Sequence, residues 1–194
     1  MSTELRLDPR TTALVLIDLQ QGIVGRTLAP YDSAHVVENA ARLGRRWNEN
    51  GALIVAVNVA FASDGGDRLQ QAVDAPAALP PGGIPASWSD LVPEIGALRA
   101  GVAITKHQWG AFHDTGLDTQ LRRRGIDTIV VCGIATNFGV ESTAREAWQH
   151  NYSVVIAEDA CSTMEAEMHR LAIEKILPRV ARVRSTAEIL SALT

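Results

Sequence analysis

The sequence predicts a single α/β domain with three layers, in which helices cover both faces of a six-stranded, mainly parallel sheet. Two observations predict this class. Short apolar runs rich in Val, Ile and Ala alternate along the chain with longer segments of helical period. The 194 residues, of which 46% are hydrophobic, can bury one substantial core and are too few to divide comfortably into two domains.

Six apolar runs are expected to form the strands of this sheet. Each is short and apolar on both faces, as strands buried in the middle of a parallel sheet are. The runs are 12–17, 52–58, 102–106, 128–132, 153–157 and 180–183.

Five segments of helical period between and after these runs are expected to form helices. In the first, 33–50, Ser33 is a candidate N-cap and Gly51 stands where a helix commonly ends. The second, 115–124, is followed by Gly125 in the same way. The others are 140–150, 164–177 with Ser162 or Thr163 as its cap, and 186–193 with Ser185 as its cap.

Composition excludes several classes of partner. The formal charge of −4, the pI near 5.7 and the lack of a basic run longer than Arg122–Arg124 argue against nucleic-acid binding. The first ten residues lack the basic start and apolar run of a secretory signal, and no apolar stretch is long enough to span a membrane. We expect a soluble, cytoplasmic protein with no membrane partner.

Cysteine and histidine usage predicts neither a metal site nor a disulfide framework. Cys132 and Cys161 are the only cysteines, there is no CxxC, and both are expected to be buried free thiols. The five histidines are scattered, although His107 and His113 could line a pocket. We therefore expect no metal and no cofactor.

One long stretch, 61–88, follows neither the helical nor the strand period. It is rich in Gly and Pro, and so long a loop in a compact domain commonly serves as a lid or a subunit contact. Together with Trp88 it is the predicted interface of a homodimer or homotetramer.

Polar residues at the ends of the apolar runs are the first candidates for chemistry, because ligands of parallel sheets collect beyond the carboxyl ends of the strands. Asp18 ends the first run, Lys106 ends the third, and the fourth leads into a turn that opens a helix. Each alone has an ordinary explanation, as a turn cap, a solvent-facing lysine and a plain turn. Together they bring a carboxylate, an ammonium group and a helix N-terminus to one edge of the sheet.

These motifs resemble the isochorismatase-like hydrolases, also called the cysteine hydrolase superfamily. The resemblance covers nearly the whole chain and implies the Rossmann-like fold of that family. It runs from TTALVLIDLQ through ITKHQWGAFHDTGLDTQLRRRGIDTIVVCGIATNFGVESTAREAW to VVIAEDACS.

In that family, Asp and Lys at the positions of Asp18 and Lys106 form a catalytic triad with a Cys in the helix-opening turn. The family pattern places this Cys at position 139, where the present chain has Gly139. A glycine has no side chain, so covalent catalysis by a thiolate cannot run at this position. Cys161 could approach the site as a replacement, but nothing near it in the sequence would lower its pKa.

The resemblance also implies the surroundings of the site. It suggests a cis peptide between Ile134 and Ala135, with the N–H groups of Ala135 and Gly139 as oxyanion donors. The Asp-x-His metal pattern that nicotinamidases carry after the second strand is absent from 57–62. The predicted substrate pocket is lined by Gln20, Trp109, Phe112, Asn137 and Phe138.

The leading functional hypothesis is non-covalent hydrolysis of a vinyl ether of the isochorismate type, a small-molecule substrate. True isochorismatases also lack the cysteine, and Asp18 would protonate the enolpyruvyl methylene. This requires an apolar setting that raises the pKa of Asp18 against the pull of Lys106. An Arg would be expected after the second strand to receive a substrate carboxylate, and the first basic residue there is Arg68.

Two alternatives remain open. In the first, an amidohydrolase, Asp18 activates a water molecule in the space left free at Gly139. In the second, the protein is a catalytically degenerate ligand-binding or oligomeric scaffold, and Asp18 and Lys106 persist as a buried ion pair.

Overall fold

The computed structural model describes residues 4–76 and 83–194. Pro80, Pro81 and Gly82 of the long segment 61–88 lie outside the described residues. The strands are β1 (Thr12–Ile17), β2 (Ile54–Val59), β3 (Val102–Lys106), β4 (Thr128–Ile134), β5 (Ser153–Ser162) and β6 (Arg182–Arg184).

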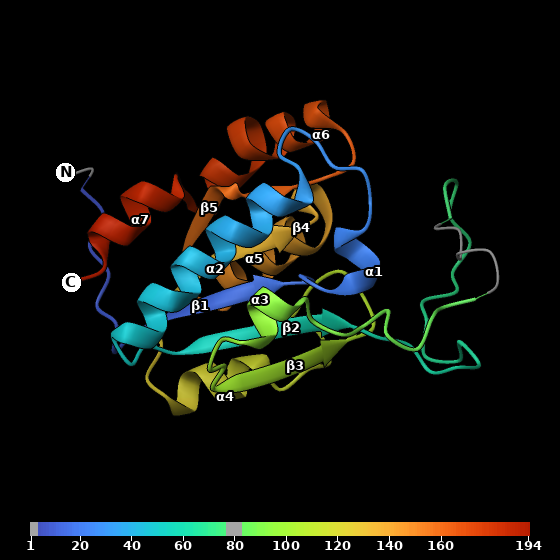
Figure 1. The fold of residues 1–194 in the computed structure, drawn as a ribbon, viewed down its shortest axis with the longest axis horizontal. Coiled ribbons are helices and arrows are strands. Elements are labelled where there is room, and N and C mark those ends of the chain that lie inside the picture. The colour runs from blue at the N-terminus through green and yellow to red at the C-terminus, as the bar shows by residue number, and fades with distance from the viewer. Residues whose placement is uncertain (1–3, 77–82) are drawn as a thin grey trace.

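These strands form one six-stranded sheet in the order β3-β2-β1-β4-β5-β6, and each neighbouring pair is parallel. Helices lie on both faces of the sheet (Figure 1). The predicted α/β class is therefore confirmed. All six residues of β1 are buried, as expected for the central strand of a sheet that is covered on both sides.

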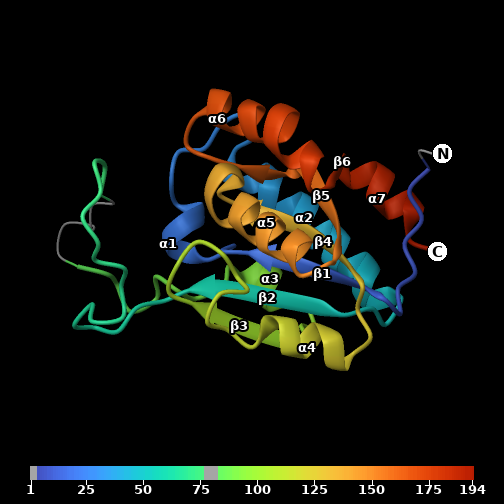
Figure 2. The same ribbon diagram turned by 180° about the vertical axis from the view of Figure 1, so that it is seen from behind.

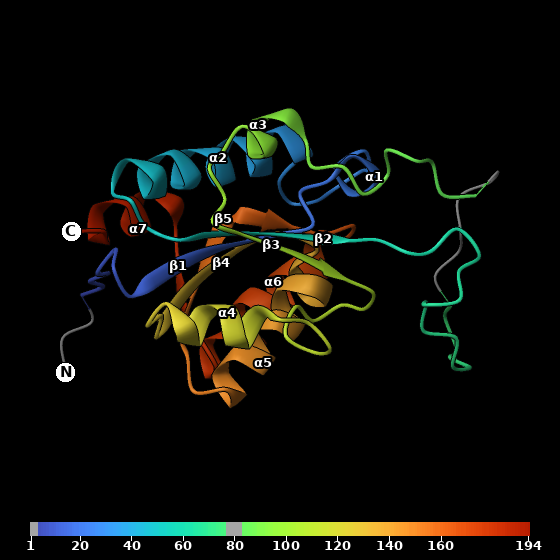
Figure 3. The ribbon, with the colours of Figure 1, turned by 90° about the horizontal axis from the view of Figure 1, so that it is seen from below.

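The helices are α1 (Gln21–Val24), α2 (Ser33–Glu49), α3 (Pro93–Gly96), α4 (Leu117–Arg123), α5 (Glu141–Gln149), α6 (Ala166–Leu171) and α7 (Thr186–Ala192). Figure 3 shows α2 and α3 on one face of the sheet, with α4, α5 and α6 on the other. The view from behind shows the same layers, with α5 in front (Figure 2). The short helices α1 and α3 were not predicted.

The start of α2 differs by one residue from the prediction. Asp32, not Ser33, is the N-cap, and its carboxylate accepts a hydrogen bond from the His35 N–H at 2.8 Å. The hydroxyl of Ser33 instead donates to the carbonyl of Val24. Ser185 caps α7 in a capping box with Glu188, as the sequence predicted.

The predicted helix 164–177 is not one regular helix. It starts at Ala166, continues beyond α6 as a π-helical turn, Ala172–Ile176, and ends in a 3-10 turn, Leu177–Arg179. Neither Ser162 nor Thr163 caps it, which corrects that prediction. Ser162 belongs to β5, which extends five residues beyond the predicted run, to the carboxyl edge of the sheet.

The segment that follows β2 leaves the layered body. In all three ribbon views, residues 62–76 and 83–87 project away from the carboxyl edge of the sheet as an arm (Figures 1, 2 and 3). Where the chain returns from the arm to the body, it is held at Trp88, whose carbonyl accepts hydrogen bonds from the Gln20 side chain and the Gly22 N–H. Within the described residues, no helix is both long and apolar enough to cross a membrane.

Candidate active site

The candidate site lies where the strand order reverses. From β1 the chain proceeds through β2 to β3 on one side, and β4 starts the other half of the sheet directly beside β1. Asp18 follows β1, and the turn that opens α5 follows β4, so both stand at this switch point. In parallel sheets of this kind, the crevice at the switch point is where ligands bind.

Asp18 and Lys106 form a buried ion pair. The Lys106 Nζ lies 2.8 Å from Oδ2 of Asp18, and the two side chains are only 2% and 8% exposed. Nζ also donates to the carbonyl of Gln108 at 3.0 Å. The second carboxylate oxygen of Asp18, Oδ1, is buried and has no hydrogen-bond partner among the described residues. That oxygen is therefore a buried hydrogen-bond acceptor that the described residues leave unsatisfied.

Burial decides the protonation state of Asp18. It raises the pKa of this carboxyl from the ordinary value of 3.8 to about 6, and the charge and hydrogen bond of Lys106 keep it from rising further. Near neutral pH, Asp18 can therefore exist both as a proton donor and as a proton acceptor. The pair thus combines a carboxyl of raised pKa with the lysine that is hydrogen-bonded to it.

Gly139 lies against this pair. A Cβ atom built on Gly139 would stand 3.3 Å from Oδ2 of Asp18, 3.0 Å from Cγ2 of Ile17 and 3.5 Å from the carbonyl of Trp109. The structure therefore brings together Asp18, Lys106 and Gly139, which come from three different parts of the sequence. No thiol is present at the point where they meet.

The backbone around Gly139 forms a tight turn between β4 and α5. The peptide bond between Ile134 and Ala135 is cis, and Thr136–Val140 form a π-helical turn. The carbonyl of Ala135 accepts hydrogen bonds from the N–H groups of Phe138 and Val140, at 3.1 and 3.2 Å. These bonds fix the course of the backbone past the Asp18 carboxylate.

A buried chain of hydrogen bonds supports this turn from behind. The Thr136 hydroxyl lies 2.8 Å from Nδ1 of His169, whose Nε2 lies 3.2 Å from the Glu158 carboxylate. The Tyr31 hydroxyl donates to the same carboxylate at 2.9 Å. The bond to His169 lowers the pKa of Glu158, and the bond from Tyr31 adds to this effect. Glu158 of β5 thus supports the turn through His169.

Two of the predicted pocket aromatics lie together beside the pair. The rings of Trp109 and Phe138 are 4.8 Å apart, and Trp109 is 63% exposed. Asn137, in the same turn as Phe138, accepts a hydrogen bond from the Thr163 hydroxyl at 2.6 Å. Trp109 is thus exposed, while Asn137 and Phe138 are half-buried, so all three reach the surface of the protein.

Two other predicted pocket residues have different places. The ring of Phe112 is buried and packs against the rings of His150 and Tyr152. Gln20 is fully buried, and its amide is bonded to the backbone of Val59 and Trp88. Both are corrections to the predicted lining: Phe112 packs the core, and Gln20 joins β2 to the returning end of the arm.

Two other basic side chains, His107 and Arg68, lie at the root of the arm. His107 contacts the carbonyl of Ala60 at 2.7 Å and the carboxylate of Asp67 at 3.3 Å. The guanidinium of Arg68 lies over the Phe61 ring, 5.6 Å from its centre. His113 is exposed. Arg68 is thus held beside the point where the arm begins.

Comparison with known proteins identifies the chain. Residues 12–188 match the family described as the isochorismatase domain. The chain belongs to the isochorismatase family. Its predicted resemblance to this family is thereby confirmed, and the motifs that carried it include Asp18, Lys106 and the turn before α5.

Three relatives match this chain over nearly its whole length and nearly their own. The isochorismatase family protein YecD of Escherichia coli O157:H7 is 49% identical, over 97% of this chain and 100% of its own length. YwoC of Bacillus subtilis is 50% identical, over 98% of each chain. An isochorismatase family structure from Burkholderia thailandensis is 41% identical with a TM-score of 0.92, over 98% of this chain and 99% of its own.

More distant relatives of this family hydrolase carry names from two reaction classes. A protein of Pseudomonas chlororaphis named as a probable isochorismatase is 28% identical, over 94% of this chain and 86% of its own. The maleamate amidohydrolase of Pseudomonas putida is 26% identical, over 82% of this chain and 76% of its own. The family membership therefore establishes a hydrolase and leaves the bond that it cleaves to be proposed.

Two residues that position the site of this family member were not found from the sequence. Thr143 donates to the Gly139 carbonyl at 2.7 Å and accepts from the Ala111 N–H at 3.2 Å. Glu146 accepts from the Phe112 N–H at 3.0 Å. Both stand on α5 and connect it to the loop that carries Trp109. Because Thr143 and Glu146 are three residues apart, they lie on one face of α5, and this spacing was the signal available in the sequence.

Neither thiol of this hydrolase can replace the family cysteine. Cys132 and Cys161 are fully buried, and burial raises the pKa of both thiols above its ordinary value. Cys161 pairs with Gly133 across β4 and β5, inside the sheet. A thiol in such surroundings is a poor nucleophile because it stays protonated. The structure thus gives no support to Cys161 as a replacement.

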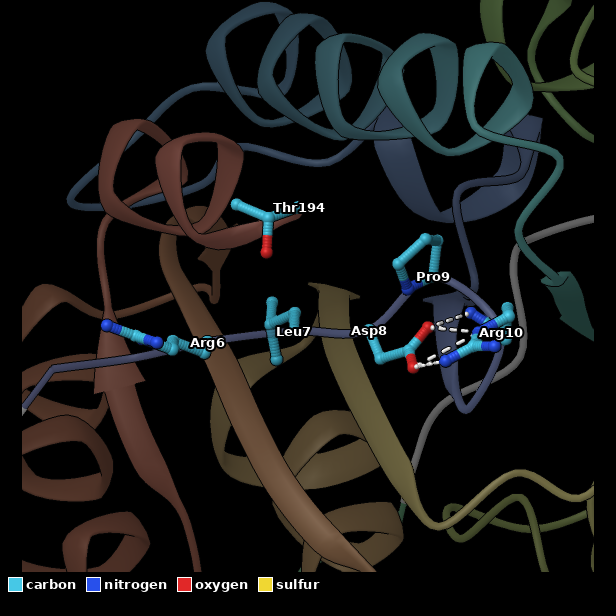
Figure 4. A pocket seen from close by; sticks show the side chains of 6 residues that line it. All are labelled: Arg6, Leu7, Asp8, Pro9, Arg10 and Thr194. Atoms are coloured by element: carbon cyan, nitrogen blue, oxygen red, sulfur yellow. Dashed lines mark hydrogen bonds and ion pairs between the residues drawn. The ribbon is translucent and has the colours of Figure 1, made fainter.

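An open pocket at the other edge of the sheet carries none of the predicted site residues. Its lining residues lie before β1 and at the end of the chain, and the Arg10 guanidinium in it is already paired with Asp8 at 2.7 Å. Figure 4 shows this pocket, lined by Arg6, Leu7, Asp8, Pro9, Arg10 and Thr194. Among residues 4–76 and 83–194, no three His, Cys, Asp or Glu side chains are grouped to hold a metal.

Proposed function

We propose that this protein hydrolyses a small-molecule vinyl ether of the isochorismate type without a covalent intermediate, and that Asp18 is the proton donor. The observation that carries the proposal is the state of Asp18 itself. Its carboxyl is buried, its pKa is raised to about 6, and one of its oxygens has no partner among the described residues. Beside it stands Gly139, which offers no nucleophile.

The reaction balances with this one acid and one water molecule. Asp18 transfers its proton to the methylene carbon of the enolpyruvyl group, which converts the vinyl ether into an oxocarbenium ion. Water adds to the cationic carbon to form a hemiketal. The bond to the ring oxygen then breaks as the hemiketal hydroxyl becomes the pyruvate carbonyl, and the proton of that hydroxyl passes to the departing ring oxygen. The products are pyruvate and a ring alcohol, and the proton lost by the attacking water returns to Asp18.

The other site groups have supporting roles in this proposal. Lys106 orients the Asp18 carboxyl through the bond to Oδ2 and leaves Oδ1 for the substrate. The N–H groups of Ala135 and Gly139 would bind an anionic group at the turn. Trp109 and Phe138 would cover the apolar part of the substrate. Arg68, held over Phe61, is the candidate receiver of a substrate carboxylate.

The pH dependence of turnover distinguishes an acid from a base at Asp18. If Asp18 acts as an acid, kcat/KM for pyruvate release from isochorismate falls as pH rises through about 6, because the active form carries the proton. Above this midpoint the fall should approach about tenfold per pH unit. The measurement is the initial rate at a series of pH values on both sides of this midpoint, with circular dichroism confirming the fold at each pH.

Lys106→Met provides the matched control for this assignment. Removing the partner that lowers the pKa of Asp18 should move the midpoint to higher pH, whatever happens to the maximal rate. If the midpoint does not respond to this change, the fall of kcat/KM with rising pH comes from the titration of a group other than Asp18. A rate that instead rises with pH through about 6 would make Asp18 a base and favour the water-mediated amidohydrolase.

A further inference from the structure

Helix α6 buries a histidine and leaves its large apolar side chains exposed. Among Ala166–Leu171, His169 is the only buried residue, with 3% of its surface exposed. Met168 and Leu171 on the same helix are 45% and 49% exposed. Burying an imidazole costs free energy unless its nitrogens are hydrogen-bonded, and an apolar side chain in this place would not carry that cost. The hydrogen bonds of His169 must therefore explain why it is there.

Both ring nitrogens of His169 have partners, and these partners determine which nitrogen carries the proton. The bonds from His169 and Tyr31 lower the pKa of Glu158, so this carboxylate is ionised near neutral pH and can only accept hydrogen bonds. Nε2 of His169, 3.2 Å from it, is then the donor. In the neutral imidazole, Nδ1 is left as an acceptor, and the Thr136 hydroxyl donates to it at 2.8 Å. Glu158 thus sets the direction of the Thr136 bond through His169.

Thr136 is the first residue of the π-helical turn that carries Gly139. Its side chain is fully buried and is bonded to His169 on α6. The next residue, Asn137, accepts a hydrogen bond from Thr163, which directly follows β5. Two successive residues of the turn are therefore held from behind by side chains of the segment from β5 to α6. Because Thr136 and His169 are both buried, they can influence a substrate only through the turn.

We propose that His169 is a positioning residue, which keeps the N–H groups of Ala135 and Gly139 in place for an anionic group of the substrate. This inference rests on the proposed function, which assigns these N–H groups to such an anion. His169 acts through the Thr136 hydroxyl, and Glu158 holds the imidazole in the required orientation. His169 exchanges no proton with the substrate.

Two amide side chains that each imitate one ring nitrogen test this role. His169→Asn places an oxygen near the position of Nδ1 and can still accept from Thr136, whereas His169→Gln keeps a donor near Nε2 for Glu158 and loses the Thr136 bond. His169→Gln should lower kcat/KM for isochorismate about ten- to a hundredfold, chiefly through KM, because the anion is bound before and during the reaction. His169→Asn should recover most of this loss.

The pH profile separates positioning from proton transfer. The midpoint near pH 6 should stay in place in both variants, because the contact between Asp18 and Lys106 is unchanged. Wild-type kcat/KM in His169→Gln, or an equal loss in both variants, overturns the proposal. A fall confined to kcat together with a moved midpoint also overturns it, since His169 would then take part in the proton transfer.

Amide hydrogen exchange tests the support of the turn without a substrate. The N–H groups of Phe138 and Val140 donate within the turn, and NMR measures their exchange rates directly. Thr136→Val, which removes the hydroxyl with little change of shape, should raise both rates about tenfold, and Thr136→Ser should restore them. The rate of Leu14, whose N–H is bonded inside the sheet, should not change.

Unchanged rates at Phe138 and Val140, or an equal rise at Leu14, would contradict a local role for the Thr136 bond. Because this measurement needs no turnover, it distinguishes a failure of the positioning role from a failure of the proposed function.

Discussion

Asp18→Asn is expected to abolish turnover of the vinyl ether. The amide cannot donate a proton as a carboxylic acid does, and general acid catalysis typically contributes about 10²–10⁴-fold. The same change also leaves the Lys106 ammonium buried without its carboxylate, which costs about 3–5 kcal/mol in comparable buried pairs. The measurements are pyruvate release and thermal unfolding, made on the same protein so that the loss of rate is referred to folded molecules.

Asp67→Asn is the matched control for this prediction. It makes the same chemical change in a more exposed carboxylate near the site. The Asp67 carboxylate contacts His107 and accepts a hydrogen bond from the Ala62 N–H. The amide oxygen of an asparagine can accept the same hydrogen bond. Its rate should stay within a few-fold of wild type, and its unfolding free energy within about 1 kcal/mol. Folded Asp18→Asn protein that turns over at more than a tenth of the wild-type rate would remove Asp18 from the role of proton donor.

Gly133→Ala is expected to prevent folding to the native state or to destabilise it by more than about 4 kcal/mol. Gly133 lies at the end of β4 with φ at 128°, a region that side chains avoid. A Cβ there would lie 2.0 Å from the carbonyl oxygen of Ile17, which is rigid backbone of β1. The substitution would therefore push β1 and β4 apart at the point where Asp18 and the turn meet. Soluble yield and chemical denaturation measure the effect.

Gly116→Ala separates this local clash from any general effect of removing a glycine. Gly116 has φ at −83°, and a methyl group added to its Cα would meet no other side chain or distant backbone within 4 Å. Its stability should therefore change by less than about 1 kcal/mol. If Gly133→Ala unfolds at the same denaturant concentration as wild type, the close approach of β1 and β4 is not required.

The sequence was most informative where side-chain period and topology act together. The fully apolar run of β1 has no other stable place than the middle of a covered sheet, and Asp18 then necessarily stands at its carboxyl end. Lys106 ends β3, two strands away from β1, and its long side chain reaches Asp18. The predicted meeting of these two groups rested on this rule about strand ends.

What the sequence could not reveal depends on the direction of single side chains. Phe112 follows Trp109 in the same loop, yet its ring turns into the core because the loop bends between them, bonded to Glu146. Gln20 stands two residues after Asp18 but uses its amide group on distant backbone. The end of β5 was missed because Glu158 and Asp159 read as polar, although both are bonded inside the fold.

The most direct test of the account is the product of isochorismate in D₂O. Wild type is incubated with isochorismate, a sample without protein serves as the blank, and the pyruvate methyl signal is followed by NMR. Proton donation by Asp18 predicts protein-dependent pyruvate that carries one deuterium on its methyl group. Unchanged isochorismate, together with turnover of an amide such as nicotinamide by the same protein, would contradict vinyl ether hydrolysis and the role assigned to Asp18.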